Sequence, residues 1–268
     1  MDVAGQHFFA GTRLAGDKHG RIALRDAGRQ CQQLLTRRLD RDWPLWIGLA
    51  NLAAGMSSDA DPRWLTEDLG KRWALVETSF KYHASCRHTH PAADALLALL
   101  QENGLKADDV AQVTAHVHQG ALDVLGPVTD PQTIHQSKFS MGFVLALIAR
   151  EGRAGLADFT DASLRDAGVR SFHDKVKMVL DPEIDRAYPR RWMGRVTVKT
   201  SDGRELEKKI TSPKGDPDNC LSRAELEDKA LRLAQYAGAA TAAEMRQVIA
   251  RVWRLREEKD VRDFLRPA

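Results

Sequence analysis

Apolar and polar residues alternate in the middle of the chain in a way that predicts β-strands. Along 112–118 every second residue is apolar, which is the pattern of a strand with one face buried. Residues 176–180 form a shorter apolar run and predict a second strand. Residues 195–200 and 205–210 flank a Ser-Asp-Gly-Arg segment, and they predict a hairpin because Gly readily adopts the backbone angles of a tight turn.

Two apolar runs at helical spacing lie among these strands. The first follows Pro91, a residue favoured in the first turn of a helix, and should end at Gly104. The second covers 137–150, opens on a Ser that could cap the helix, and is closed by Gly152. Its high apolar content predicts a well-buried helix.

The C-terminal part changes to helix-forming residues after Pro217. Ser222 and Glu225 have the spacing of a capping box, so a helix should begin there, and a second helix should run through Met245 and Val252. At the other end, residues 1–50 show no clear periodicity, and only 61–69 predicts a short helix. The predicted order is therefore helical, then mixed, then helical.

Composition narrows the possible functions. The 268 residues include 40 Lys and Arg against 37 Asp and Glu, a net charge of +3 with both signs mixed along the chain, which argues against a nucleic-acid surface. No apolar stretch approaches the roughly 20 residues that span a bilayer, and no secretory signal is evident at the N-terminus. Three widely spaced Cys without a CxxC pair fit a reducing cytoplasm.

Residues 81–90, Lys-Tyr-His-Ala-Ser-Cys-Arg-His-Thr-His, are the densest chemical feature of the sequence. They precede a predicted helix, whose free N–H groups and dipole favour an anion. Arg87 could bind a carboxylate through two hydrogen bonds, Lys81 could neutralise another, and His90 could transfer a proton near neutral pH. The segment is therefore a candidate site for a carboxylate substrate.

Other interpretations of these residues remain open at this stage. The segment could be a solvated loop whose charges are merely exposed, or His83, His88 and His90 could suggest a metal, although Cys pairs and acidic ligands at metal spacing are lacking. Basic neighbours could lower the pKa of Cys86, but no nucleophilic triad can be assigned. His116 and His118 are interpreted as members of a solvent-facing strand face. No Gly-rich phosphate loop is present, so a nucleotide cofactor is not expected.

Residues 81–90 resemble a motif of the MmgE/PrpD family, in which a Lys and a His flank a Cys-Arg pair. Further segments are similar to that family in the same order, and together they cover about Met56 to Leu233. These segments are Ser137–Phe143, Ala154–Asp161, the Trp192–Gly203 hairpin and Pro217–Ser222.

The resemblance implies an α+β fold with two domains. An all-helical domain would be built from both chain ends, here residues 1–77 and 217–268, and a smaller α+β lid at 78–216 would be inserted between them. The family's long N-terminal helical segment supplies an acidic residue and several His, and nothing in residues 1–50 resembles it. The sequence is therefore expected to lack the family's N-terminal half and to have little activity on its own.

The resemblance also implies a function. The family includes 2-methylcitrate dehydratase, cis-aconitate decarboxylase and iminodisuccinate epimerase, which use no metal or organic cofactor. A cytoplasmic, homodimeric lyase or isomerase for a small di- or tricarboxylate is expected, with no nucleic-acid or membrane partner. The alternative is a non-catalytic remnant, or a binding half that needs a separate N-terminal partner.

Site residues follow from the same resemblance. Lys81 and His90 are the expected catalytic residues, facing one common cleft, and the expected substrate-binding residues are Tyr82, Cys86, Arg87, His88, Lys138 and Ser140. Phe143 departs from the family, since many members have Tyr there.

Overall fold

The computed structural model describes residues 52–61, 63, 67–68 and 70–257 of the chain. The chain divides into two compact units, Met1–Val76 and Glu77–Ala268. In the first unit, residues 52–56 are helical. The short helix predicted at 61–69 falls mostly outside the described residues, as does everything predicted for 1–50.

The second unit contains a four-stranded open sheet with the order β2-β1-β3-β4. Strand β1 is parallel to β2 and antiparallel to β3, and β3 forms an antiparallel hairpin with β4. The strands are β1 (Val110–Val117), β2 (Val176–Leu180), β3 (Gly194–Thr200) and β4 (Glu205–Ile210). All four predicted strands are confirmed, and Gly203 occupies the hairpin turn with a φ of +90°.

The described residues also form helices of varied length. The α-helices are α4 (His90–Asn103), α5 (Gln119–Leu125), α6 (Ile134–Ser137), α7 (Met141–Glu151), α8 (Asp161–Arg165), α9 (Ala167–His173), α10 (Pro182–Ala187), α11 (Arg223–Ala237) and α12 (Ala242–Trp253). Short 3-10 turns are η2 (Ala74–Glu77), η3 (Arg87–Thr89), η4 (Ala107–Asp109), η5 (Leu156–Asp158), η6 (Pro217–Asn219) and η7 (Leu255–Glu257).

Helix ends follow the capping signals of the sequence. α4 has Pro in its first turn and ends on Gly104 with a left-handed φ of 63°. The prediction of one helix over 137–150 is wrong in its first turn. Ser140 takes an extended backbone and its side chain accepts a hydrogen bond from the Phe143 N–H, so it ends the preceding turn and caps α7.

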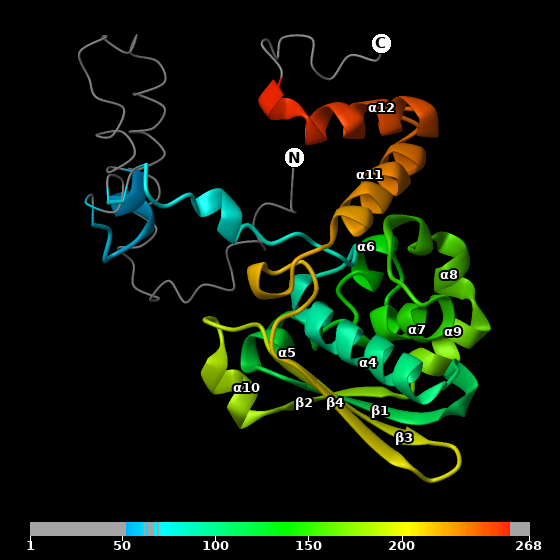
Figure 1. The fold of residues 1–268 in the computed structure, drawn as a ribbon. Coiled ribbons are helices and arrows are strands. Elements are labelled where there is room, and N and C mark those ends of the chain that lie inside the picture. The colour runs from blue at the N-terminus through cyan, green and yellow to red at the C-terminus, as the bar shows by residue number, and fades with distance from the viewer. Residues whose placement is uncertain (1–51, 62, 64–66, 69, 258–268) are drawn as a thin grey trace. The chain divides into compact units, whose positions relative to one another are not determined.

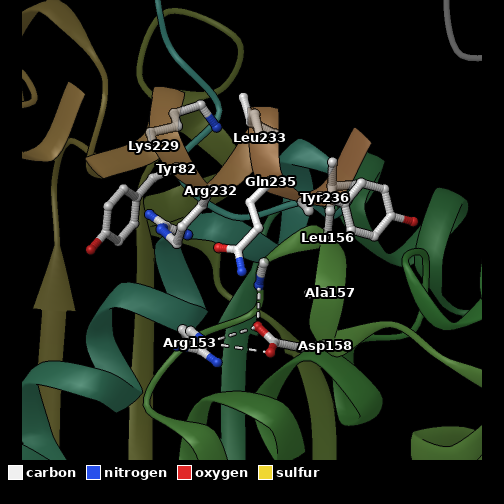
Figure 2. A pocket seen from close by; sticks show the side chains of 12 residues that line it. Tyr82, Arg153, Leu156, Ala157, Asp158, Lys229, Arg232, Leu233, Gln235 and Tyr236 are labelled. Carbon is white, nitrogen blue, oxygen red and sulfur yellow. Dashed lines mark hydrogen bonds and ion pairs between the residues drawn. The ribbon is translucent and has the colours of Figure 1, made fainter. Parts of the chain in front are cut away.

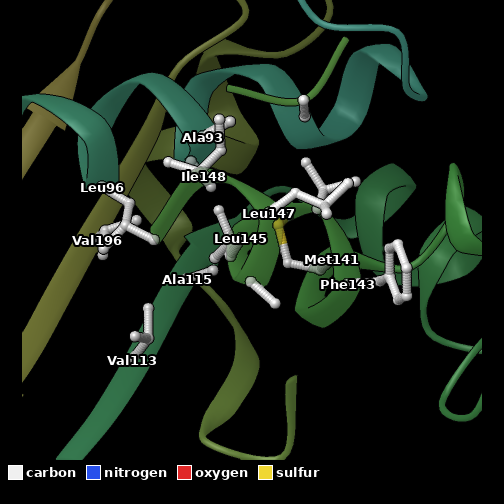
Figure 3. Close-up of a cluster of buried hydrophobic side chains, with 14 of the residues drawn as sticks. Ala93, Leu96, Val113, Ala115, Met141, Phe143, Leu145, Leu147, Ile148 and Val196 are labelled. Atoms are coloured by element: carbon white, nitrogen blue, oxygen red, sulfur yellow. The ribbon is translucent and has the colours of Figure 1, made fainter. Parts of the chain in front are cut away.

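The core lies between the sheet and the helices on one of its faces (Figure 1). α4 packs against β3 and β4, and α7 packs against β2, α4 and α9. Figure 3 shows side chains of the two helices meeting those of the sheet. Completely buried members include Leu96 of α4, Leu145 of α7, Val113 of β1 and Val196 of β3.

The opposite face of the sheet is polar. His116 Nε2 lies 2.9 Å from Thr197 Oγ1 on the neighbouring strand, and this pair is half-buried. The prediction that His118 shares this face is wrong, because β1 ends at Val117 and His118 precedes α5 with only 3% of its surface exposed. The fold class is thus mixed α and β with a four-stranded open sheet. Among the described residues, no helix is long and apolar enough to cross a membrane.

Candidate active site

The segment 81–90 is held against the sheet domain by main-chain hydrogen bonds to two other parts of the chain. The Ala84 N–H donates to the Ala154 carbonyl and the Cys86 N–H donates to the Lys138 carbonyl, both at 2.8 Å. Three of the segments that resembled one family in sequence, 81–90, 137–143 and 154–161, therefore meet in space. This is not a solvated loop, because His83, Ser85 and Thr89 are buried.

Asp94, in the first turns of α4, ties this segment to a second loop. One of its carboxylate oxygens lies 2.8 Å from His83 Nε2, and the other accepts the Lys214 N–H at 2.6 Å. Asp94 was not among the residues predicted for the site, although an acidic residue near a helix N-terminus next to a His-rich segment is a usable signal. Asp94 brings the loop before Asp216 next to the 81–90 segment.

A pocket of about 690 Å³ opens between these segments, and we call it the Lys81 pocket. It is lined by Ser79, Lys81, Arg87, Pro189, Arg190, Arg191, Trp192, Thr211, Ser212, Asp216, Pro217 and Asp218. Four basic side chains thus face two acidic ones. Arg190, Arg191 and Trp192 could not be assigned to this pocket from the sequence, because their approach to Lys81 depends on how the chain returns to β3.

The basic side chains of this pocket differ in how far their charge is compensated. Arg87 forms an ion pair with Asp216, and its guanidinium carbon lies 5.6 Å from the centre of the Trp192 ring. Lys81 is exposed, and its Nζ donates to the Ser85 carbonyl at 3.2 Å. Within the described residues, neither Arg190 nor Arg191 pairs with a carboxylate. The pocket therefore keeps positive charge available for an anion.

His90 lies apart from this pocket. Its side chain is 0% exposed, and neither ring nitrogen makes a hydrogen bond to the described part of the chain. Burial, reinforced by His83, Arg87 and Lys81, lowers the pKa of His90 to about 2, so the ring is neutral. His90 does not line the Lys81 pocket, and the expected common cleft of Lys81 and His90 stays a prediction.

His88 belongs to a cluster of rings beside the pocket. Its Nδ1 lies 3.2 Å from Nε2 of His118, and the His118 ring stacks on Tyr188 with centroids 3.8 Å apart. His88 also contacts Trp192, with centroids 5.1 Å apart. Burial and the neighbouring His118 lower the pKa of His88 to about 4. His88 does not line the pocket itself but packs against Trp192, which does.

The remaining predicted binding residues do not line the Lys81 pocket. Tyr82 lines a second pocket, described below. The half-buried Lys138 has its Nζ 5.6 Å from the centre of the Phe159 ring. Ser140 is buried as the cap of α7. Cys86 is half-buried, and burial raises the pKa of its thiol, an effect that outweighs the lowering by the nearby Lys81 charge.

Metal ligands were a second interpretation of the histidines. His83 and His90 lie edge to face with centroids 5.2 Å apart, whereas His88 faces His118. Within the described residues, no group of three His, Cys, Asp or Glu side chains is placed to hold a metal ion.

Comparison with known proteins identifies the family. A search of curated proteins gives no match. The family model of the MmgE/PrpD C-terminal domain matches residues 83–255, which include most of the 81–90 segment, the whole sheet and both C-terminal helices. A match of this length covers more than half of the chain. The chain therefore belongs to the MmgE/PrpD family.

Proposed function

We propose that the Lys81 pocket binds a small di- or tricarboxylate and that the protein takes part in lyase or isomerase chemistry on it, with 2-methylcitrate dehydration as the nearest model. The observation that carries this proposal is the pocket of about 690 Å³ with four basic and two acidic side chains beside the 81–90 segment. A volume of that size holds a compound with several carboxylates.

Lys81, Arg190 and Arg191 would neutralise the carboxylates. Arg87 would act differently, because its pairing with Asp216 fixes the guanidinium and leaves less of its charge for a ligand. Removal of a proton next to a carboxylate creates negative charge, which Lys81 would stabilise. Loss of water, loss of CO2 or return of the proton could then follow.

His90 would position substrate or relay a proton in this scheme. Because its ring is neutral, it can donate one hydrogen bond and accept another. Both ring nitrogens of His90 are buried, and neither makes a hydrogen bond within the described residues. A shift of the segment around His83, whose ring packs on His90, would be needed for a substrate to reach it.

A second candidate is a carboxylate-binding half that obtains its acid–base groups from a further segment or partner. It is favoured by the lining of the Lys81 pocket, which contains no His, and by Asp216, whose carboxylate is already bound to Arg87. General acid–base catalysis needs a group within about 2.6–3.2 Å of the proton that it moves. Both candidates require binding, and only the first requires turnover by this chain.

We further propose the family's arrangement for the chain, with a lid at 78–216, a helical domain from 1–77 and 217–268, and a homodimer in the cytoplasm. The exposed apolar side chains of the C-terminal helices, such as Val252 and Trp253, support a further packing surface there.

Calorimetric titration with tricarballylate and citrate tests the binding step. Lys81→Ala should weaken both ligands roughly 10- to 150-fold, because a hydrogen bond to a charged group contributes about 1.5–3 kcal/mol. The matched control is Lys177→Ala, an exposed lysine on β2 that does not line the pocket. Equal affinity of wild type and Lys81→Ala would refute the proposed binding role.

Assays with 2-methylcitrate, citrate, cis-aconitate and iminodisuccinate then separate the two candidates. Turnover that falls in Lys81→Ala and in His90→Gln favours the enzyme. Tight binding without turnover favours the binding half.

A further inference from the structure

We propose that a second pocket of the protein binds an organic anion with an apolar body. This pocket, which we call the Tyr82 pocket, has a volume of about 500 Å³ and lies between the 153–158 segment and α11. In Figure 2, Arg232 and Gln235 extend from α11 toward the Arg153–Asp158 pair, with Tyr82 and Tyr236 on either side. It shares no lining residue with the Lys81 pocket.

One part of the Tyr82 pocket is apolar and aromatic. Leu156 and Leu233 face it from η5 and α11, and the two tyrosine rings flank them. Tyr236 and Leu233 are 57% and 39% exposed, so a ligand body placed there would remove apolar surface from water. Removing such surface from water favours binding. A compact polycarboxylate has no apolar body for this surface.

Another part of the pocket is cationic. Three basic residues, Arg153, Lys229 and Arg232, face one acidic residue, Asp158. Arg153 lies 3.2 Å from Asp158, and Arg232 lies 2.7 Å from Asp228 on its own helix. These two ion pairs are partly exposed, and such pairs are weak. An incoming anion can therefore compete with the carboxylates for the two arginines.

Lys229 is the least compensated of the three. Its Nζ donates to the Lys81 carbonyl at 2.7 Å, and within the described residues it pairs with no carboxylate. Burial, and to a lesser extent the nearby Arg232 charge, lowers the pKa of Lys229, and Arg153 and Arg232 line the same pocket. A carboxylate, sulfonate or phosphate group would relieve that repulsion.

The backbone separates the two pockets at adjacent residues. The side chain of Lys81 faces one pocket and that of Tyr82 faces the other, while Lys229 contacts only the main chain of Lys81. Lys81→Ala therefore removes a charge from the Lys81 pocket and keeps the carbonyl that Lys229 binds. This substitution distinguishes the pockets experimentally.

The test uses 3-phenylpropionate and its neutral amide as probes in calorimetric titrations of the full chain. The acid should bind at least tenfold more tightly than the amide. Arg232→Gln should weaken the acid roughly tenfold or more, because a charged hydrogen bond is lost. Ala157→Trp, at an exposed lining position, should block both probes.

Matched controls make the result decisive. Arg223→Gln removes the same charge from the same helix at a residue that does not line the pocket, and it should leave binding unchanged. Lys81→Ala should also leave 3-phenylpropionate binding unchanged, whether or not the Lys81 pocket binds polycarboxylates. Equal affinity for acid and amide, unchanged binding in Arg232→Gln, or a loss in Lys81→Ala as large as in Arg232→Gln would overturn the inference.

Discussion

The helices packed on the sheet and the two C-terminal helices have equally clear sequence signals but very different burial. α4 and α7 bury apolar residues along most of their length. α11 buries only Ala234, and α12 buries no residue against the described chain. α4, α7 and α11 nevertheless end on a left-handed Gly, and α7, α11 and α12 begin after a Ser or Thr whose side chain caps the helix. Capping signals thus determine where a helix begins, and the surface available to it determines how much it contributes to stability.

The C-terminal helices instead contact each other through polar groups. Trp253 donates from its indole N–H to Glu227 at 2.8 Å, and Arg223 lies over the Trp253 ring at 4.5 Å from its centre. Capping boxes at Ser222 and Thr241 complete the hairpin. Exposed contacts of this kind contribute on the order of 1 kcal/mol or less each. The sheet layer should therefore dominate the free energy of unfolding.

The largest expected effect is in the sheet layer. Leu96→Ala removes a completely buried side chain from α4 and should lower the free energy of unfolding by about 2–5 kcal/mol, measured by urea denaturation. Leu255→Ala, at a side chain that is 47% exposed, is the control. A similar loss in both variants would contradict the difference between the two regions.

Low pH should decrease the free energy of unfolding, because His90 is buried in its neutral form. The pKa of His90 is about 2 in the folded chain and about 6.5 when unfolded, so only the unfolded state takes up this proton as the pH falls. The free energy of unfolding is therefore unaffected by His90 above pH 6.5. Below that pH it decreases by about 1.4 kcal/mol per pH unit, because only the unfolded chain binds the proton. In His90→Gln, the free energy of unfolding measured by urea denaturation should therefore fall less steeply between pH 6 and pH 4, by about 1.4 kcal/mol per pH unit. An unchanged slope would show that His90 is not buried in neutral form.

A smaller and local effect is expected in α11. Ser222→Ala removes the side-chain acceptor of the Glu225 N–H and should destabilise the helix by about 1 kcal/mol. Hydrogen exchange should speed up in the amides of α11 and stay unchanged in β1 and β3. Equal acceleration in the strands would mean that the helix and the sheet unfold together.

The smallest effect on unfolding is expected at α12. Val252→Ser, at a side chain that is 44% exposed, should change the free energy of unfolding by no more than about 0.5 kcal/mol. It should also reduce self-association in sedimentation velocity, because it removes exposed apolar surface. A large destabilisation would show that this face is covered within the chain.

Strand positions and helix ends could be predicted from the sequence because both depend on local patterns. The alternation in 112–118, the Asp-Gly turn and the capping box at Ser222 specify structure through neighbouring residues alone. His118 could not be placed, because its burial depends on stacking against Tyr188, 70 residues further along the chain. The arrangement of family domains is not tested by the structure and stays a prediction.

The candidate site was predictable as a segment but not as a pocket. Residues 81–90 could be recognised from their chemistry, yet no local pattern places Lys81 and Tyr82 in different pockets or predicts that His90 is buried. Arg190, Arg191 and Trp192 join Lys81 only because the chain from α10 into β3 passes beside it. Such long-range convergence depends on topology, which local patterns do not encode.

Binding of a tricarboxylate in the Lys81 pocket can be seen in a crystal of the protein soaked with tricarballylate. We expect density for the ligand in the Lys81 pocket, with carboxylates within about 3.2 Å of Lys81 Nζ and of the Arg190 or Arg191 guanidinium. An empty Lys81 pocket at saturating ligand, or a ligand bound only elsewhere, would contradict it.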